Sequence, residues 1–224
     1  MKTNSKIALL SQHNGYIGRE YAKALIDAKI QFYYFQFGNN EESDEIEDHR
    51  CGGLWSAPRI QDLIGCRKLQ FKSLQSNQFR EFIVKNKIKL AIQGGVGEII
   101  KQEVIDIFSD GILNFHPGDL PYYRGSSTPE WQIYHRKDVV CTCHFIDKGI
   151  DTGDIIEKKV LNVNKKSYEQ MRASIYPLIA KFVVEIASNY IREVKLKRKS
   201  QGEGVTWPYI GSEKIKEISK RMKI

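Results

Sequence analysis

Long apolar runs are absent from this sequence. No stretch of its 224 residues approaches the roughly 20 consecutive apolar positions that a membrane-spanning helix needs. The first apolar stretch, at residues 7–10, ends at Ser11 and is followed by polar residues up to Asn14. It is therefore shorter than the apolar core of about 7–15 residues in a secretion signal. We interpret it as a first strand and predict a cytoplasmic protein that has no membrane partner.

Cysteine is scarce, and its spacing does not indicate a metal site. Cys141 and Cys143 stand two apart in an alternating segment and should share one face of a strand, whereas His144 should face the other way. No second pair of ligands follows, and the other cysteines, Cys51 and Cys66, are isolated. We therefore predict no metal and no disulfide framework.

The G-x-G-x-x-G fingerprint of dinucleotide-binding proteins is also missing. The segment after the first strand reads SQHNGYIGRE, with only Gly15 and Gly18. A nucleotide bound there is weakly supported, and the alternative is a tight turn from strand to helix.

Basic residues exceed acidic ones, 35 against 27, which gives a formal net charge of +8. Such a balance favours anionic partners, such as nucleic acid, phosphorylated metabolites or polyglutamylated cofactors. Much of the positive charge lies late in the chain, at residues 191–200 and 212–224, where a solvated tail and helix face would explain it equally well. Charge alone does not identify the partner.

Short apolar runs alternate with helix-like segments, which is typical of an α/β fold. We predict a mostly parallel sheet with helices on both faces, a domain at residues 1–195, and a C-terminal appendage with a short helix at 196–224. The acidic stretch at 41–50 should be a mobile loop. The expected strands lie at residues 6–10, 31–37, 67–71, 89–95, 111–117, 139–147 and 155–163, and the expected helices at 18–29, 77–87, 97–108, 128–137, 167–194 and 212–223.

Residues suited to acyl transfer gather around one predicted strand end. Asn114 and His116 are two apart on that strand and should share a face, just before Pro117 ends it. Ligands of open α/β sheets bind at such strand ends, and an amide beside an imidazole can stabilise a developing oxyanion. Asp151 follows a later strand and could reach His116, which would raise the pKa of the imidazole and favour its cation. From spacing alone, a structural N-x-H and an ordinary turn aspartate remain alternatives.

The same residues carry a family resemblance. The segment NFHPGDLPYYRG, followed by GIDTGDII, resembles the paired motifs of the folate-dependent formyltransferases, over about residues 90–156. That family includes enzymes that formylate glycinamide ribonucleotide, methionyl-tRNA and nucleotide-linked amino sugars. The resemblance implies a Rossmann-like formyltransferase core.

It also implies roles for individual residues. Asn114 matches the asparagine that holds the formyl oxygen, and His116 the histidine that stabilises the oxyanion. Asp151 matches the aspartate that positions this histidine and assists proton removal from the attacking amine. The implied donor is N10-formyltetrahydrofolate, whose pterin lies against segments matching residues 94–100 and 147–151. The corresponding contacts are Val96, Glu98, Ile100, Asp147 and Gly149, largely through the backbone.

The acceptor amine is less constrained. Arg124 is a candidate for binding an anionic substrate, or simply a surface arginine. The segment PYYRGSSTPEW looks most like the nucleotide-sugar enzymes, so we predict a nucleotide-linked amino sugar made for surface polysaccharide such as O-antigen, with no nucleic acid partner. Only about thirty residues follow the long predicted helix, which disfavours tRNA. Glycinamide ribonucleotide formylation, formyl-folate hydrolysis and a non-catalytic folate-binding role are the alternatives, and a homodimer is left open.

Overall fold

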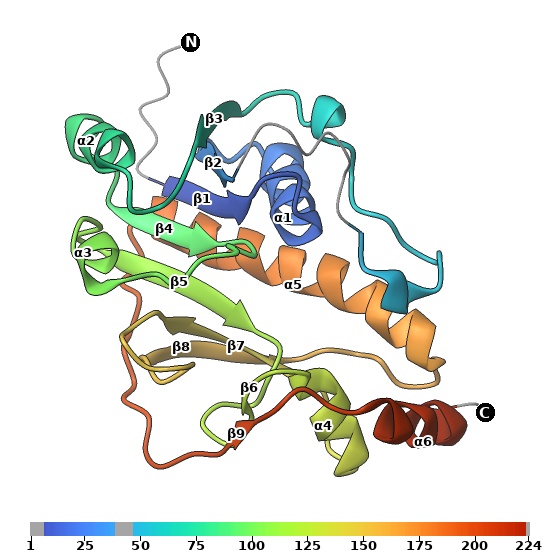
Figure 1. Cartoon of the computed structure of the whole chain (residues 1–224). Helices are drawn as coiled ribbons and strands as arrows, with labels where there is room; N and C mark the ends of the chain where they lie inside the picture. The colour runs from blue at the N-terminus through green and yellow to red at the C-terminus, as the bar shows by residue number, and fades with distance from the viewer. Residues whose placement is uncertain (1–6, 39–46, 223–224) are drawn as a thin grey trace. The chain divides into compact units, whose positions relative to one another are not determined.

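The computed structural model describes residues 7–38 and 47–222 (Figure 1). A seven-stranded, mostly parallel sheet has the strand order β3-β2-β1-β4-β5-β7-β8, and β6 pairs with β9 separately. The strands are β1 (Ile7–Gln12), β2 (Tyr33–Phe37), β3 (Arg67–Phe71), β4 (Leu90–Gln93), β5 (Gly111–His116), β6 (Arg124–Gly125), β7 (Val140–Phe145), β8 (Ile155–Val160) and β9 (Thr206–Trp207). The α-helices are α1 (Tyr16–Asp27), α2 (Asn77–Lys85), α3 (Gln102–Ile105), α4 (Thr128–Tyr134), α5 (Tyr168–Ile191) and α6 (Ser212–Met222). Short 3₁₀ turns occupy His49–Cys51 and Ile60–Asp62.

The chain divides into two compact units, and the division falls within β5. Unit 1 comprises Met1–Asp48, Ser56–Asn114 and Val183–Val194, and unit 2 comprises His49–Trp55, Phe115–Phe182 and Lys195–Ile224. None of the helices in the described ranges is long and apolar enough to cross a membrane. The division into residues 1–195 and 196–224 stays a prediction.

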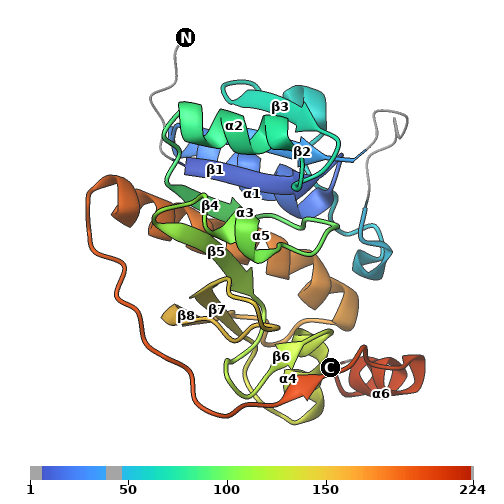
Figure 2. The same cartoon turned by 60° about the vertical axis from the view of Figure 1, so that its left-hand side comes forward.

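Unit 1 is built on parallel strands that are buried on both sides. In β1, five of six residues are buried, and β1 pairs in parallel with β2 and with β4. Continuous apolar strands of this kind are expected where helices cover both faces. Figure 2 shows α2 and α3 in front of these strands and α1 behind them. Phenylalanines join helix to sheet: the rings of Phe35 and Phe79 meet edge to face, with centroids 5.3 Å apart.

Unit 2 contains the antiparallel pair β7 and β8. The pairing shifts register between Cys143 and His144, which marks a bulge or irregularity in β7. The ring of Phe115 in β5 packs edge to face against Phe182 in α5, with centroids 5.3 Å apart. The end of β5 is therefore fixed by packing within this unit.

The long helix α5 begins as its sequence suggests. The Ser167 hydroxyl accepts the Gln170 backbone N–H at 3.2 Å, while the Gln170 side chain accepts the Ser167 N–H at 2.9 Å. This reciprocal capping box satisfies two of the N–H groups that a helix start leaves unpaired. Pro129 lies in the first turn of α4, where its missing N–H costs no helical hydrogen bond.

The segments at residues 97–108 and 41–50 were predicted as a helix and a loop. The helix expected at residues 97–108 is wrong in length, because α3 covers only Gln102–Ile105 and the segment before it is irregular. Gly95 and Gly97 lie there, and glycine favours irregular backbone over helix. Of the acidic stretch predicted as a loop, residues 41–46 lie outside the described residues, and His49–Cys51 forms a 3₁₀ turn.

Candidate active site

His116 and Asp151 meet within unit 2. His116 is the last residue of β5 and is 5% exposed. Its Nδ1 lies 3.4 Å from Asp151 Oδ2, and its Nε2 lies 2.7 Å from the backbone oxygen of Tyr123. A β-strand thus delivers the imidazole to a position where both ring nitrogens face oxygen atoms.

The Asp151 carboxylate is held from three sides. Besides His116, it accepts the Gly125 backbone N–H at 2.9 Å through Oδ2. Its Oδ1 lies 3.5 Å from Nε2 of His144. Asp151 itself adopts the left-handed backbone conformation, with φ 53°, which aspartate tolerates better than most residues.

His144 is a member of this cluster that the sequence did not indicate. Strand alternation placed His144 opposite Cys141 and Cys143, and with no ligand pair nearby nothing marked it. In the structure it is buried, its Nδ1 lies 2.8 Å from the backbone oxygen of Phe145, and its Nε2 faces Asp151. The aspartate in the next loop was the available signal, whereas the register shift beside His144 is visible only in the structure.

The electrostatics of the pair differ from the sequence prediction. Burial raises the pKa of Asp151, but His144, His116 and the Gly125 N–H outweigh it and bring this pKa to about 2. Burial lowers the pKa of His116 below its usual value, although Asp151 and the Tyr123 carbonyl act in the opposite sense. The predicted rise in the pKa of His116 is therefore wrong, because desolvation of the buried ring exceeds the attraction of the carboxylate.

This arrangement can take up a proton. Each imidazole in the cluster lies between two acceptors, a backbone carbonyl and the Asp151 carboxylate. A neutral ring carries one N–H and so satisfies only one of its two acceptors. An added proton on either ring would complete a second hydrogen bond to Asp151. The cluster thus has the properties of a general base assisted by a carboxylate.

Asn114 precedes His116 by two positions on the same strand and is half-buried. It is the last residue of unit 1, whereas His116 belongs to unit 2. Its role as a donor to the formyl oxygen stays a prediction.

The residues predicted to bind the donor in unit 1 follow β4. The Glu98 carboxylate accepts the Ser73 hydroxyl at 2.5 Å and the Leu74 N–H at 3.3 Å, so this side chain fixes its own loop. Within residues 7–38 and 47–222, the backbones of Val96 and Ile100 make no hydrogen bond to another residue. Backbone groups of this kind fit the recognition of a flat heterocycle by its ring edge, which is the mode that the resemblance implies.

The predicted donor contacts in unit 2 form a tight turn. Asp147 Oδ1 accepts the Gly149 N–H at 3.0 Å and the Thr152 hydroxyl at 2.7 Å. A Cβ on Gly149 would lie 2.1 Å from that hydroxyl oxygen, so a larger residue would displace the Thr152 side chain from Asp147. Asp147 therefore organises the loop that carries Asp151, and a donor contact at Gly149 would be through its backbone.

Arg124 is partly committed to the protein itself. One of its terminal nitrogens donates to Gln201 Oε1 and to the Gly202 carbonyl, each at 3.0 Å. A role in binding substrate stays a prediction for the rest of the guanidinium group.

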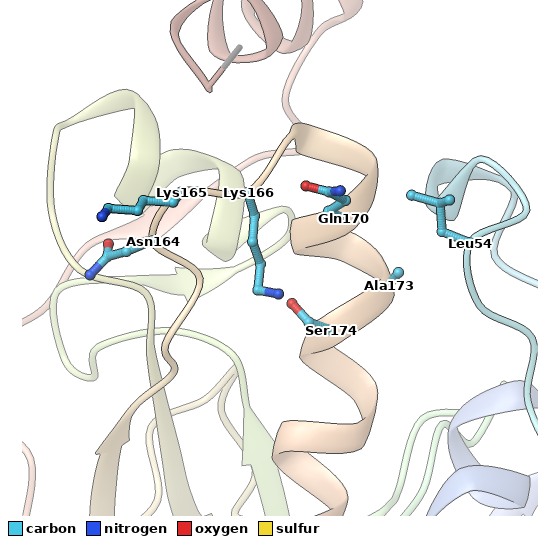
Figure 3. Close-up of a pocket in the computed structure, with 7 residues that line it drawn as sticks. All are labelled: Leu54, Asn164, Lys165, Lys166, Gln170, Ala173 and Ser174. Atoms are coloured by element: carbon cyan, nitrogen blue, oxygen red, sulfur yellow. The ribbon is translucent and has the colours of Figure 1, made fainter. Parts of the chain in front are cut away.

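A pocket of about 490 Å³ lies beside the first turns of α5 in unit 2 (Figure 3). Figure 3 shows the Lys166 side chain extending toward Ser174, whereas Lys165 and Asn164 point away from the helix. Its lining residues are Leu54, Asn164, Lys165, Lys166, Gln170, Ala173 and Ser174. Two amines beside amide and hydroxyl groups are suited to an anionic ligand. Among the residues that the structure describes, no group of three or more His, Cys, Asp or Glu side chains could hold a metal ion.

Comparison with known proteins confirms the resemblance. The formyl transferase family matches residues 2–185, so the chain belongs to this family. The methionyl-tRNA formyltransferase of Desulforamulus reducens is 34% identical over 96 residues, which are 42% of this chain and 30% of that protein. That of Caldanaerobacter subterraneus is 24% identical over 160 residues, 69% of this chain and 51% of the other. The chain thus spans about half or less of the length of these relatives.

Solved structures show the same fold. A 4-N formyltransferase from Francisella tularensis has a TM-score of 0.63 at 17% identity, over 93% of this chain and 77% of its own. Phosphoribosylglycinamide formyltransferase from Streptococcus pneumoniae has a TM-score of 0.60 at 18% identity, over 84% of this chain and 99% of its own. An N-formyltransferase from Helicobacter canadensis, in complex with folinic acid and dTDP-3-aminofucose, has a TM-score of 0.60 at 15% identity, over 94% of this chain and 72% of its own.

Proposed function

We propose that this protein transfers a formyl group from N10-formyltetrahydrofolate to the amine of a nucleotide-linked amino sugar, such as a dTDP-4-amino-4,6-dideoxyhexose. The observation that carries the reaction type is the pair formed by the buried His116 and the half-buried Asp151, within a chain of the formyl transferase family. We further propose a cytoplasmic location, a catalytic domain at residues 1–195, and an appendage at 196–224.

The proposed chemistry is direct attack of the amine on the formyl carbon. A new C–N bond forms to the acceptor and the bond from the formyl carbon to N10 breaks, so the folate carrier supplies the formyl group and leaves with a proton on N10. Asn114 donates to the formyl oxygen as it gains negative charge. His116, which the resemblance implies stabilises this oxyanion, also takes up the proton that the amine loses. Asp151 is ionised, positions the His116 ring and assists this proton removal by stabilising the resulting cation. Neither residue forms a covalent bond to the substrate.

The donor assignment rests on the family and on local geometry. The unpaired backbone groups of Val96 and Ile100 support backbone recognition of the pterin, and the Asp147–Gly149 turn presents a second backbone segment. Glu98 contributes by fixing the first of these loops. One protein of the same fold carries folinic acid in its solved structure, which supports a folate donor.

The acceptor assignment rests on the segment after β5 and on pocket chemistry. The segment PYYRGSSTPEW, which includes Arg124, looks most like those of the sugar enzymes. The pocket lined by Lys165 and Lys166 suits a phosphate-bearing acceptor. Glycinamide ribonucleotide and tRNA also carry phosphate. Methionyl-tRNA is a second candidate acceptor because the relatives found by sequence are named methionyl-tRNA formyltransferases. Lysines alone do not separate these acceptors.

The test is a panel of acceptors offered with N10-formyltetrahydrofolate. Amino-sugar nucleotides, glycinamide ribonucleotide and methionyl-tRNA are compared by loss of the free amine. Formylation of an amino-sugar nucleotide at the highest kcat/KM supports the proposal, and a preference for either other acceptor overturns the sugar assignment. A parallel incubation with the folate alone measures formate, and rapid formate release would instead identify a hydrolase.

A further inference from the structure

The C-terminal segment contributes a side chain to the loop that carries Asp151. Gln201 Nε2 donates to the backbone oxygen of Asp151 at 3.1 Å and to that of Gly153 at 2.6 Å. Its Oε1 accepts from Arg124 at 3.0 Å. One amide therefore joins the two segments that follow β5 and β7, and all four residues belong to unit 2.

A second contact of the same segment is with Gly125, which itself binds the carboxylate of Asp151. Strand β9 pairs in parallel with β6, in the register Gly125 with Trp207. Gly125 has φ +89°, and a Cβ there would lie 2.5 Å from the Trp207 backbone oxygen. Glycine is thus required for β9 to pass this close. The N–H of the same glycine donates to Asp151 Oδ2.

Asp151 needs such support because of its own conformation. A left-handed backbone costs a non-glycine residue on the order of 1 kcal/mol and persists where the surroundings hold it in place. The carboxylate must also stay within 3.4 Å of His116 and 3.5 Å of His144. The Asp147 turn holds the loop from one end, and the Gln201 amide binds carbonyls at the other.

We propose that Gln201 is a positioning residue for the formyl transfer reaction. It fixes the backbone of residues 151–153 so that the Asp151 carboxylate faces both imidazoles. This inference rests on the proposed function. It also assigns a part of the site to a residue outside the 2–185 range that the family matches.

The variant that tests this is Gln201→Met, which keeps the length of the side chain and removes its hydrogen bonds. We expect kcat to fall about tenfold, since two backbone carbonyls and Arg124 lose a partner. The KM for the folate donor should stay within about twofold. In the free protein, the pKa of the Asp151 carboxyl, measured by NMR titration, should rise from its value in the wild type. If Gln201 only stabilised the fold, its substitution would lower the melting temperature without changing the pKa of Asp151.

The matched control is Glu203→Ala, two residues away on the exposed part of the segment, for which kcat and the pKa of Asp151 should equal those of the wild type. An unchanged pKa of Asp151 in Gln201→Met overturns the proposal, as does a changed pKa with unchanged kcat. If the wild type formylates no amine, the proposed function fails. The titration of the free protein then decides the role of Gln201 alone.

Discussion

Arg19 in unit 1 and Asp151 in unit 2 are both largely enclosed ionic side chains, and their charges are satisfied differently. In unit 1, the fully buried Arg19 donates to Glu47 at 2.8 Å and to the backbone oxygens of Asn14, Ala57 and Pro58 at 3.2, 3.2 and 2.8 Å. In unit 2, Asp151 faces two imidazoles, each of which also faces a backbone carbonyl.

The difference separates a structural charge from a reactive one. Each of the Arg19 nitrogens has an oxygen to bind, and guanidinium does not lose its proton in proteins, so the cluster has no second state. Around Asp151 the acceptors outnumber the protons of two neutral rings, so the cluster gains a hydrogen bond when it takes up a proton. Burial alone therefore does not distinguish the two groups, whereas the capacity of the Asp151 cluster to take up a proton does.

The largest expected effect is on catalysis in unit 2. In His116→Ala we expect formyl transfer to fall on the order of 10³-fold, because the variant loses the proton acceptor and the partner of Asp151. Steady-state kcat with the preferred acceptor measures it, and circular dichroism checks the fold. His49→Ala, which changes an exposed histidine, should retain full activity. Transfer at the wild-type rate by His116→Ala would remove His116 from the mechanism.

The next effect is on stability in unit 1. Arg19→Ala removes the guanidinium that Glu47 and three backbone carbonyls share as a donor, and should lower the unfolding free energy by about 3 kcal/mol. Denaturant titration measures the loss. The control Lys23→Ala removes an exposed pair with Asp27 and should cost less than about 0.5 kcal/mol. At a temperature where the Arg19 variant stays folded, its kcat should match that of the wild type, and a large fall in kcat would break the comparison.

A pH experiment sharpens the state of Asp151. Its pKa of about 2 lies below the ordinary 3.8, so its contribution is present above pH 4 and is lost as pH falls toward 2. This loss amounts to about 2 kcal/mol of unfolding free energy. Between pH 4 and pH 2, the unfolding free energy of Asp151→Asn should therefore fall by that amount less than that of the wild type. Denaturant titration at a series of pH values measures this difference. Asp62→Asn, at an exposed pair with Arg59, should keep the wild-type slope, and equal slopes for both variants would contradict the assignment.

The smallest effect concerns the second imidazole. His144→Gln retains a donor toward Asp151 but cannot become a cation, and should lower kcat about tenfold with little change in KM. The ratio of its kcat to that of His116→Gln, measured under the same conditions, shows which of the two imidazoles contributes more to the rate. A loss as large as that of His116→Gln would show that the two rings contribute equally.

Much of the fold was readable because each strand and helix carries its own pattern. The alternation of apolar runs predicted the α/β sheet, which is confirmed, and the helix expected at residues 167–194 is observed as α5. Helix α3 was predicted too long because apolar spacing continues through residues where the backbone does not stay helical.

The site residues could be predicted from the sequence only where they lie in one of the paired motifs. Asn114, His116 and Asp151 were named from paired motifs, and the structure brings His116 and Asp151 together. His144 was missed because its side chain reaches Asp151 beside a register shift in β7, which alternation does not predict. Gln201 was missed because its partners lie far away in the sequence. The pKa of His116 was predicted in the wrong direction because burial depends on the whole fold.

The pairing of β6 with β9 also sets an order of events during synthesis. Domains fold as the ribosome releases them, from the N-terminus onward. His116 and Asp151 leave the ribosome well before Thr206 and Trp207, so a nascent chain holds both groups while the strand that borders them is still missing. The proposed chemistry would then wait until β9 has been synthesised, and nascent chains that lack β9 would not consume the folate donor.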